Sequence, residues 1–242
     1  WDENIGFFGR FECINDQAVA EALFAAAEDY VRAQGADAIR GPATFSINDI
    51  CGLLIEPYDD PPTVLSPYNP PYYQTLIENA GFSKVMDVLS FYYDRPMVAS
   101  FGLEQKLSRI VKRVEERANV TIRKIDLKRK KEEFAALKEV YNDAWSQNWG
   151  FVPMTERELD ALIADLGQFF DPKLAYFAEY EGKLVGFALA IPNFNEVLAK
   201  VYPRPGVPEV WSLLQAGYHW KVRDTIRGAR FPLMGVRKEF RS

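Results

Sequence analysis

Polar and aromatic side chains gather in residues 40–72, around a stretch rich in proline. Six prolines fall between Pro57 and Pro71. Because proline fixes φ and removes a backbone donor, this stretch is predicted to be a stiff, irregular loop. Polar and aromatic groups on rigid backbone are typical of a pre-organised small-molecule site. The side chains that would form it are Arg40, Asn48, Asp49, Tyr68, Asn69 and Tyr72. The alternative is structural: the Asn and Asp residues cap turns and helices, Asn69 capping a helix that begins at the next prolines, and the tyrosines cover the core.

Few other residues have the spacing of a catalytic or metal-binding group. Cys13 and Cys51 lack CxxC spacing and His/Cys neighbours, which argues against a metal site. Two buried, reduced thiols are expected instead, and this cysteine usage fits a cytoplasmic protein. His219 is the single histidine and has no visible partner, so it is predicted to be a partly exposed helical residue.

The composition limits the classes of partner. The 242 residues suit one large domain or two small ones, and hydrophobic residues make up 48%. The net charge of −5 argues against general attraction to nucleic acid or to anionic lipid. Residues 106–131 carry eleven basic and three acidic residues, but the run lacks interleaved aromatics for base stacking. No apolar run reaches the ~20 residues of a membrane helix. Nucleic acid and membrane are therefore not expected as partners.

The first half of the chain is predicted to contain strands and two helices around the loop. A strand covers residues 5–14, and a helix capped by Asn15 or Asp16 follows to about Gln34. Gly35 is expected to end that helix in a left-handed conformation. A short strand begins at Ala38. After the loop, a helix ends at Gly81, and residues 82–93 read as one or two strands.

The second half begins again after a charged connecting helix at residues 103–117. A strand at residues 121–127 precedes a helix over residues 134–145, and Thr155-Glu-Arg-Glu158 forms a capping box for the next helix. Two strands, 174–180 and 183–191, are joined by the two-residue turn Glu181-Gly182. A helix over 208–227 and a terminal strand over 231–236 complete the order.

These motifs resemble the GNAT superfamily of N-acyltransferases. Residues 176–189 resemble its central hairpin, residues 76–82 its late helix-Gly-Phe element, and residues 234–241 its fourth strand entering the pyrophosphate loop. A closer resemblance, to a family of uncharacterised bacterial GNAT-like proteins that extend beyond this chain at both ends, rests on residues 40–42, 48–49, 52–56, 67–73 and 148–155.

The resemblance implies an α/β (α+β) fold with a mixed, mostly antiparallel sheet flanked by helices, built as two partial GNAT-like units. Residues 1–96 would be the C-terminal half of a first, degenerate unit, 97–118 a linker helix, and 119–242 the N-terminal half of a second unit. The chain would then be truncated at both ends. The two halves could pair into one sheet, or pair across a homodimer.

The resemblance also implies acyl-CoA chemistry, with acetyl-CoA or another acyl-CoA as the cofactor of the intact protein. Backbone N–H groups hold the pyrophosphate, and a strand N–H polarises the thioester carbonyl. Val236, Arg237 and Arg241 match the entry to that phosphate loop. The corresponding stretch of the first unit, residues 12–18, has no glycine. Tight binding of acyl-CoA is therefore not expected for this chain.

Catalytic groups are harder to assign from the sequence. Glu179 and Glu239 are the carboxylates near the expected acceptor region, and Tyr72 is a candidate acid. Trp149 lies where the superfamily builds its substrate wall, although a core anchor is the alternative. The expected function is acyl transfer to an unknown small-molecule amine or peptide, with this fragment inactive by itself. The alternative is a non-catalytic module that binds a small molecule or peptide through the proline-rich loop.

Overall fold

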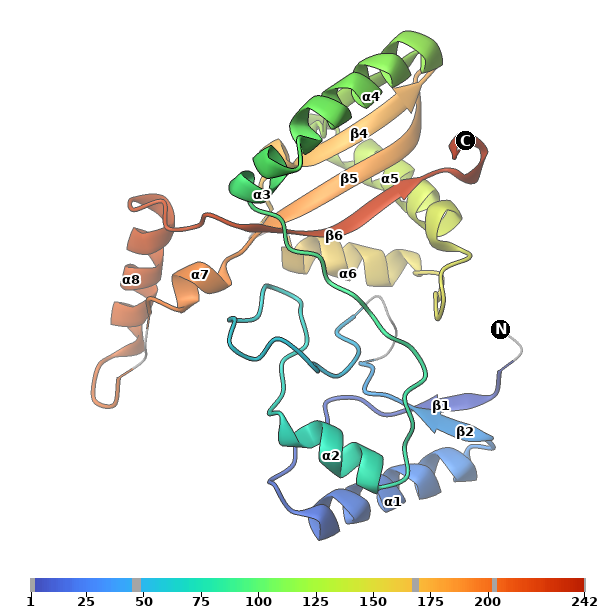
Figure 1. The fold of residues 1–242 in the computed structure, drawn as a ribbon, viewed down its shortest axis with the longest axis vertical. Helices are drawn as coiled ribbons and strands as arrows, with labels where there is room; N and C mark the ends of the chain where they lie inside the picture. Colours follow the sequence, from blue (N-terminus) through green and yellow to red (C-terminus); the bar gives the residue numbers. More distant parts are fainter. Residues whose placement is uncertain (1–2, 45–48, 167–169, 202–203, 242) are drawn as a thin grey trace. The chain divides into compact units, whose positions relative to one another are not determined.

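A computed structural model describes residues 3–44, 49–166, 170–201 and 204–241. The chain divides into two compact units: residues 1–88 together with 148–152, and residues 89–147 together with 153–242. Figure 1 shows the helices and strands along the chain. None of the helices within the described ranges combines the length and the apolar character needed to cross a bilayer.

The first unit is built from two short parallel strands and two helices. Strand β1 (Ile5–Phe7) pairs with β2 (Ala38–Arg40), with Gly6 opposite Ile39. Helix α1 (Gln17–Ala33) begins at Asp16, whose side chain accepts hydrogen bonds from the amides of Ala18 and Val19. Helix α2 (Tyr72–Asn79) follows the proline-rich loop. Gly35 and Gly81, which follow the two helices, have positive φ, the conformation that glycine adopts without strain.

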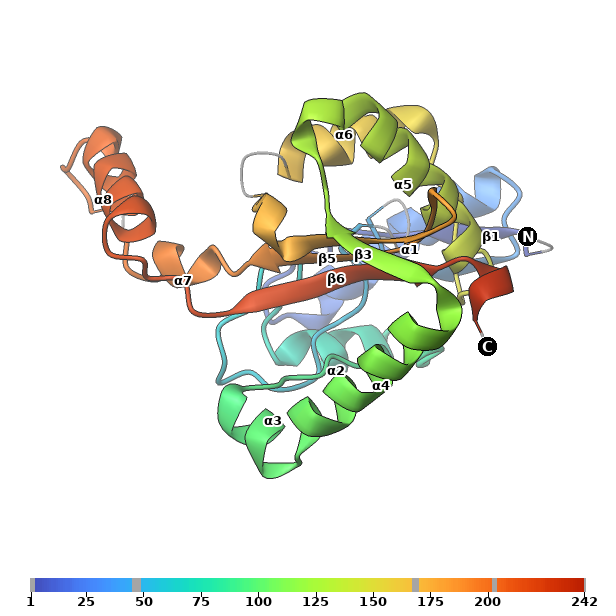
Figure 2. The same ribbon diagram turned by 90° about the horizontal axis from the view of Figure 1, so that it is seen from above.

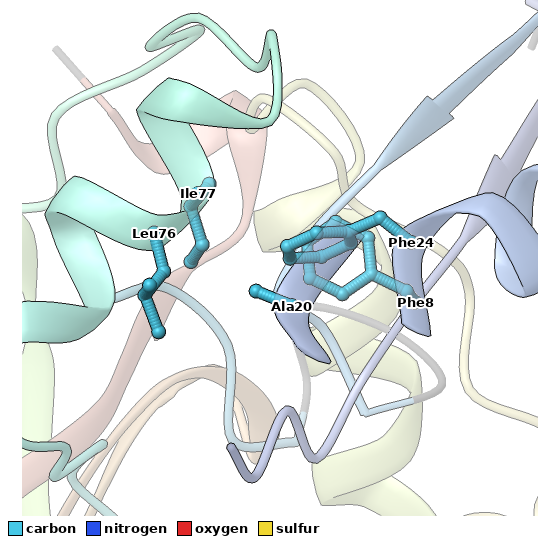
Figure 3. Packing of buried hydrophobic residues seen from close by; sticks show 5 residues of the cluster. All are labelled: Phe8, Ala20, Phe24, Leu76 and Ile77. Atoms are coloured by element: carbon cyan, nitrogen blue, oxygen red, sulfur yellow. The ribbon is translucent and has the colours of Figure 1, made fainter. Parts of the chain in front are cut away.

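An aromatic-rich core holds these elements together. Phe8, Ala20, Phe24, Leu76 and Ile77 form a buried cluster between α1 and α2 (Figure 3). The rings of Phe8 and Phe24 meet edge to face, with their centroids 5.3 Å apart, a favourable aromatic geometry. The same cluster receives Phe82 of the Gly-Phe motif, whose ring centroid lies 4.8 Å from that of Phe24.

The second unit contains a four-stranded antiparallel sheet in the order β3-β4-β5-β6. The strands are β3 (Val120–Lys124), β4 (Ala175–Tyr180), β5 (Lys183–Pro192) and β6 (Ala229–Val236). Residues Glu181 and Gly182 both have positive φ in the turn between β4 and β5, which is the geometry of a tight hairpin turn. The mixed α/β architecture with an antiparallel sheet agrees with the sequence prediction at this level.

Helices cover this sheet unequally. Helices α5 (Lys130–Trp145) and α6 (Glu156–Leu166) lie on one side, and α4 (Leu103–Ala118) on the other (Figure 2). Three further helices are α3 (Arg95–Ser100), α7 (Asn195–Leu198) and α8 (Glu209–Lys221). One-turn 3-10 helices occur at Leu127–Arg129, Pro172–Leu174 and Lys238–Phe240. The Thr155–Glu158 capping box is present, with the Thr155 amide donating to Glu158 Oε2 at 2.8 Å.

Two sequence predictions about these elements are wrong. Residues 82–93 form no strand in the described chain. Asn69 does not cap α2, whose N-cap is Pro71. The described strands belong to two sheets, one of two strands and one of four. In addition, β1 covers only Ile5–Phe7 of the predicted strand, and α8 ends at Lys221, earlier than predicted.

Candidate functional site

The end of β6 is the part of the second unit where the sequence places the cofactor. The Arg237 amide donates to the Val185 carbonyl at 2.8 Å, which continues the ladder between β5 and β6. In an antiparallel ladder, alternate residues exchange hydrogen bonds with the partner strand and the residues between them point away. In the register of β5 and β6, Gly235 lies opposite Phe187 and Val236 opposite Gly186. The amides and carbonyls of Met234 and Val236 therefore point away from β5.

That outward edge of β6 pairs with no other described strand, because β6 ends the sheet order. Two side chains occupy its carbonyls. Trp145 Nε1 donates to the Met234 carbonyl at 3.1 Å, and Arg241 Nε donates to the Val236 carbonyl at 2.8 Å. Both contacts agree with the outward direction expected from the register. The N–H groups of Met234 and Val236 remain along the same edge as donors.

Close packing of α5 on β6 fixes the position of this edge. A Cβ atom added at Gly235 would lie 2.9 Å from Ala144 Cβ and 2.8 Å from Phe187 Cε1. Only glycine therefore allows the helix to approach the strand this closely without a shift of backbone or ring. The Asp143 carboxylate of the same helix accepts from the Lys238 amide at 2.9 Å and so holds the turn that follows β6.

The two arginines predicted to approach a phosphate group make internal contacts. Arg237 Nε donates to the Leu184 carbonyl at 3.0 Å, and its Nη2 lies 3.0 Å from Glu139 Oε2. Arg241 Nη2 donates to the carbonyl of Ala144. In this conformation both guanidinium groups stabilise the junction between β6 and α5.

The two carboxylates proposed as bases lie in different surroundings. Glu239 is exposed in the last turn of the described chain. Glu179 accepts from Arg123 Nη2 at 2.7 Å, and Arg123 also makes a two-pronged contact with Glu133, at 2.7 and 2.8 Å. The hydrogen bonds that the Arg123 guanidinium donates to Glu133 and Glu179 raise its pKa. Glu133 is only 2% exposed, while the Arg123 and Glu179 side chains are 29% and 25% exposed. Arg123 therefore links the Glu179 carboxylate to a buried carboxylate.

In the first unit, two residues of the predicted site support the loop. The Asn69 side chain is buried, accepts from the Leu54 amide at 2.7 Å and donates to the Leu54 carbonyl at 3.2 Å. The Tyr72 hydroxyl donates to the Cys13 carbonyl at 2.9 Å. Its neighbour Tyr73 donates to Glu12 at 2.8 Å, and burial raises the pKa of the Tyr73 phenol. Asn69 and Tyr72 therefore both make contacts within the fold, but Asn69 binds Leu54 and does not cap α2 as the structural alternative expected.

Arg40 and Trp149 are brought together although they are distant in sequence. The Arg40 guanidinium lies 5.4 Å from the centre of the Trp149 ring, which is within cation–π range. Glu3 pairs with Arg40 at 3.2 Å. Trp149 remains 42% exposed, so it is not a core anchor. Asp49 and Tyr68 are exposed, and Asn48 lies outside the described residues.

Sequence reasoning missed the contribution of α5. Trp145, Asp143 and Glu139 all bind the end of β6 or the turn after it, but the sequence pattern of this helix indicated only an apolar stripe. The available signal was Trp145 at the end of that stripe, because a tryptophan at the edge of a core usually finds a partner for its indole N–H. No group of His, Cys, Asp and Glu within the described ranges has the arrangement of a metal site.

Comparison with known proteins gives relatives over nearly the whole chain. No model of a known protein family matches. The chain is 35% identical to Protein YghO of Escherichia coli over 244 aligned residues, covering 99% of this chain and 59% of that protein. It is 36% identical to a protein of Caulobacter vibrioides named bacterial ceramide synthase, over 98% of this chain and 59% of the relative. The chain thus spans about three-fifths of the length of these bacterial relatives.

Solved structures show a weaker likeness. An agmatine N-acetyltransferase matches with a TM-score of 0.27 and a polyamine N-acetyltransferase of Drosophila melanogaster with 0.28, each at 13% identity over 51% of this chain. They cover 62% and 63% of the solved chains. At these scores the likeness carries no conclusion about fold or function.

Proposed function

We propose that this chain is part of an N-acyltransferase that joins an acyl group, carried as a CoA thioester, to the amine of a long-chain, lipid-like acceptor. The observation that carries the proposal is the 36% identity to a bacterial ceramide synthase over 98% of the chain. A ceramide is an amide between a long-chain amino alcohol and a fatty acid. Making one therefore requires the transfer of an acyl group to nitrogen, the same class of reaction that the sequence motifs imply.

The edge of β6 offers a chemical element that such a transfer needs. When an amine attacks a thioester, negative charge develops on the carbonyl oxygen, and a fixed backbone N–H stabilises it. The amides of Met234 and Val236 point along the unpaired edge, while side chains already occupy the neighbouring carbonyls. An acyl carbonyl lying along this edge would meet donors. The attacking amine would form the C–N bond as the C–S bond of the thioester breaks, and the proton lost by the amine would pass to the leaving CoA thiolate.

The activity can be measured with protein expressed from the complete reading frame. The assay follows release of CoA thiol and identifies the amide product by mass spectrometry, with a long-chain amino alcohol or a short amine such as agmatine as acceptor. We expect the amide product only when a long-chain amine and a long-chain acyl-CoA are both present. Turnover with agmatine alone would contradict the lipid-like acceptor, and no turnover with any amine would contradict acyl transfer.

A backbone substitution tests the role of the β6 edge. Proline lacks the N–H, and at a residue whose N–H points away from the partner strand it removes no ladder hydrogen bond. Pro232 already occupies the irregular part of β6. Val236→Pro should lower kcat by about 10²–10³-fold, whereas Val236→Ala should retain activity.

Met234→Pro removes the other outward N–H, so comparison of the two proline variants identifies the donor that is used. Circular dichroism and thermal melting of each variant verify the fold. If both well-folded proline variants keep full kcat, the edge does not polarise the carbonyl.

A further inference from the structure

Helix α8 presents its apolar residues on the side that faces away from its own unit. Val210, Trp211, Leu213, Leu214 and Tyr218 are all exposed, Leu213 to 71%. With 3.6 residues per turn, these positions lie on one broad face of the helix. The opposite face carries Ser212, Gln215, Ala216 and His219, which are all partly buried. A water-exposed surface helix has the reverse arrangement, with its apolar stripe against the core.

The attachment of α8 to its unit explains why the apolar face remains outside. Trp220 meets Phe194 edge to face at 5.3 Å, next to α7. His219 Nδ1 contacts Thr225 at 3.2 Å. The segment returns to the sheet where the Glu196 carboxylate accepts from the amides of Arg227 and Gly228, at 2.7 and 2.9 Å. These contacts use the polar face and the C-terminal end of the helix, and Figure 1 shows α8 standing beyond the sheet.

The charges beside the apolar face are mostly positive. Residues 198–227 contain five Lys and Arg residues against two acidic ones, although the whole chain carries a net charge of −5. The basic residues are exposed and lie at both ends of α8: Lys200, Arg204, Lys221, Arg223 and Arg227. The net charge around α8 is therefore positive, whereas the negative net charge of the whole chain argued against lipid binding. Membrane attraction acts over about one Debye length, so the local charge decides it.

We propose that α8 lies on the surface of a membrane containing anionic lipid, with its apolar face inserted at the level of the headgroups. Leucine and valine on one face, with an exposed Trp and Tyr, are typical of interfacial helices. Aromatic rings with a polar edge favour the zone between headgroup and hydrocarbon. The flanking Lys and Arg residues then meet lipid phosphates. This inference does not depend on acyl transfer, although a membrane location would bring the protein close to lipid substrates.

Vesicle sedimentation tests the proposal on the 242-residue chain. The chain should pellet with vesicles of phosphatidylcholine containing about 30% phosphatidylglycerol, and the bound fraction should fall at least several-fold in high salt or with phosphatidylcholine alone. The double variant Leu213→Glu/Leu214→Glu should lose binding. A control, Leu107→Glu/Ile110→Glu, changes two apolar residues of α4 that are 54% and 56% exposed, against 71% and 60% for Leu213 and Leu214, and should retain binding.

Brominated lipids supply a second measurement that does not depend on the glutamate variants. Bromine quenches tryptophan within the bilayer, so quenching should be strong for the wild-type chain and much weaker for Trp211→Phe. Equal binding of the α8 and α4 variants, or equal quenching with and without Trp211, would overturn the proposal. So would binding insensitive to lipid charge and salt. Sedimentation velocity tests whether a second copy of the chain covers the apolar face instead. If the chain does not bind vesicles but forms a dimer that the α8 variant abolishes, the partner of this face is a second copy.

Discussion

At the scale of single residues, Asn69 shows why the sequence left two interpretations open. An Asn side chain has one acceptor and two donors whether it binds a ligand or its own backbone. In the structure it binds both the amide and the carbonyl of Leu54, fifteen positions earlier. Sequence patterns describe contacts one to four residues apart, so this longer contact was not predictable. Arg40 and Trp149 were predicted separately, but not as a pair, for the same reason.

Asn69→Ala is therefore expected to destabilise the fold rather than to affect a ligand. The change leaves the partly buried amide of Leu54 without its acceptor, which costs about 1–3 kcal/mol in the free energy of unfolding. Urea denaturation followed by circular dichroism measures the loss. Tyr68→Ala, at the exposed preceding residue, is the control and should stay within about 0.5 kcal/mol of wild type. Equal stability of the two variants would return Asn69 to the candidate ligand-binding residues.

At the scale of elements, local patterns predicted most helices and strands of the second unit. Helical spacing located α5, and the Glu181-Gly182 turn located the hairpin of β4 and β5. The prediction failed at residues 82–93, where residues of high β-propensity, such as Val85, Val88 and Phe91, form no strand. A strand requires a partner edge for its backbone groups, and propensity alone does not supply one. The position of the β6 edge was likewise not predictable, because contacts from α5, which is distant in sequence, fix it.

The capping box of α6 gives a prediction about pH. The Thr155 amide and, secondly, its hydroxyl donate to the Glu158 carboxylate and lower its pKa. A carboxylate whose pKa is lower in the folded state stabilises the helix above its unfolded pKa, and this contribution is lost as the pH falls through the folded value. The start of α6 should therefore loosen in acid. An NMR titration of the Glu158 carboxyl carbon should give a pKa below the ordinary range of glutamate.

Two variants of Thr155 separate the two donors. Thr155→Ala removes the hydroxyl but keeps the amide, so it should raise the pKa of Glu158 part of the way toward its ordinary value. Thr155→Ser retains a hydroxyl at the same position and should leave the titration unchanged. A Glu158 titration that is the same in all three proteins would show that the hydroxyl contributes nothing.

At the scale of the whole molecule, the chain forms two units whose described strands belong to separate sheets, and the second unit begins with an exposed segment. Residues 89–93 form neither helix nor strand, and Phe91 and Tyr92 are 74% and 76% exposed. The sequence predicted a division of the chain but not this exposed crossing, since it assigned these residues to a sheet. The apolar side chains of residues 89–93, which suggested a strand, are exposed to solvent.

This exposed segment should be the first site of cleavage by chymotrypsin, which requires an accessible aromatic residue in extended backbone. Limited digestion of the native chain, followed by mass spectrometry, should yield early cuts after Phe91, Tyr92 or Tyr93. A variant with all three aromatics changed to serine should lose these early products. First cleavage elsewhere, for example after Phe101 beyond α3, would mean that residues 89–93 are protected in solution.

The side chains on the outer edge of β6 have a consequence for aggregation. A strand added to a sheet edge, as in cross-β assembly, needs both donors and acceptors along that edge. Trp145 and Arg241 already occupy the carbonyls of Met234 and Val236. If a strand of another molecule paired with this edge on heating, it could form only about half of the backbone hydrogen bonds of a normal ladder, because the two carbonyls are occupied. We therefore expect the Trp145 and Arg241 side chains to hinder polymerisation through the outer edge of β6.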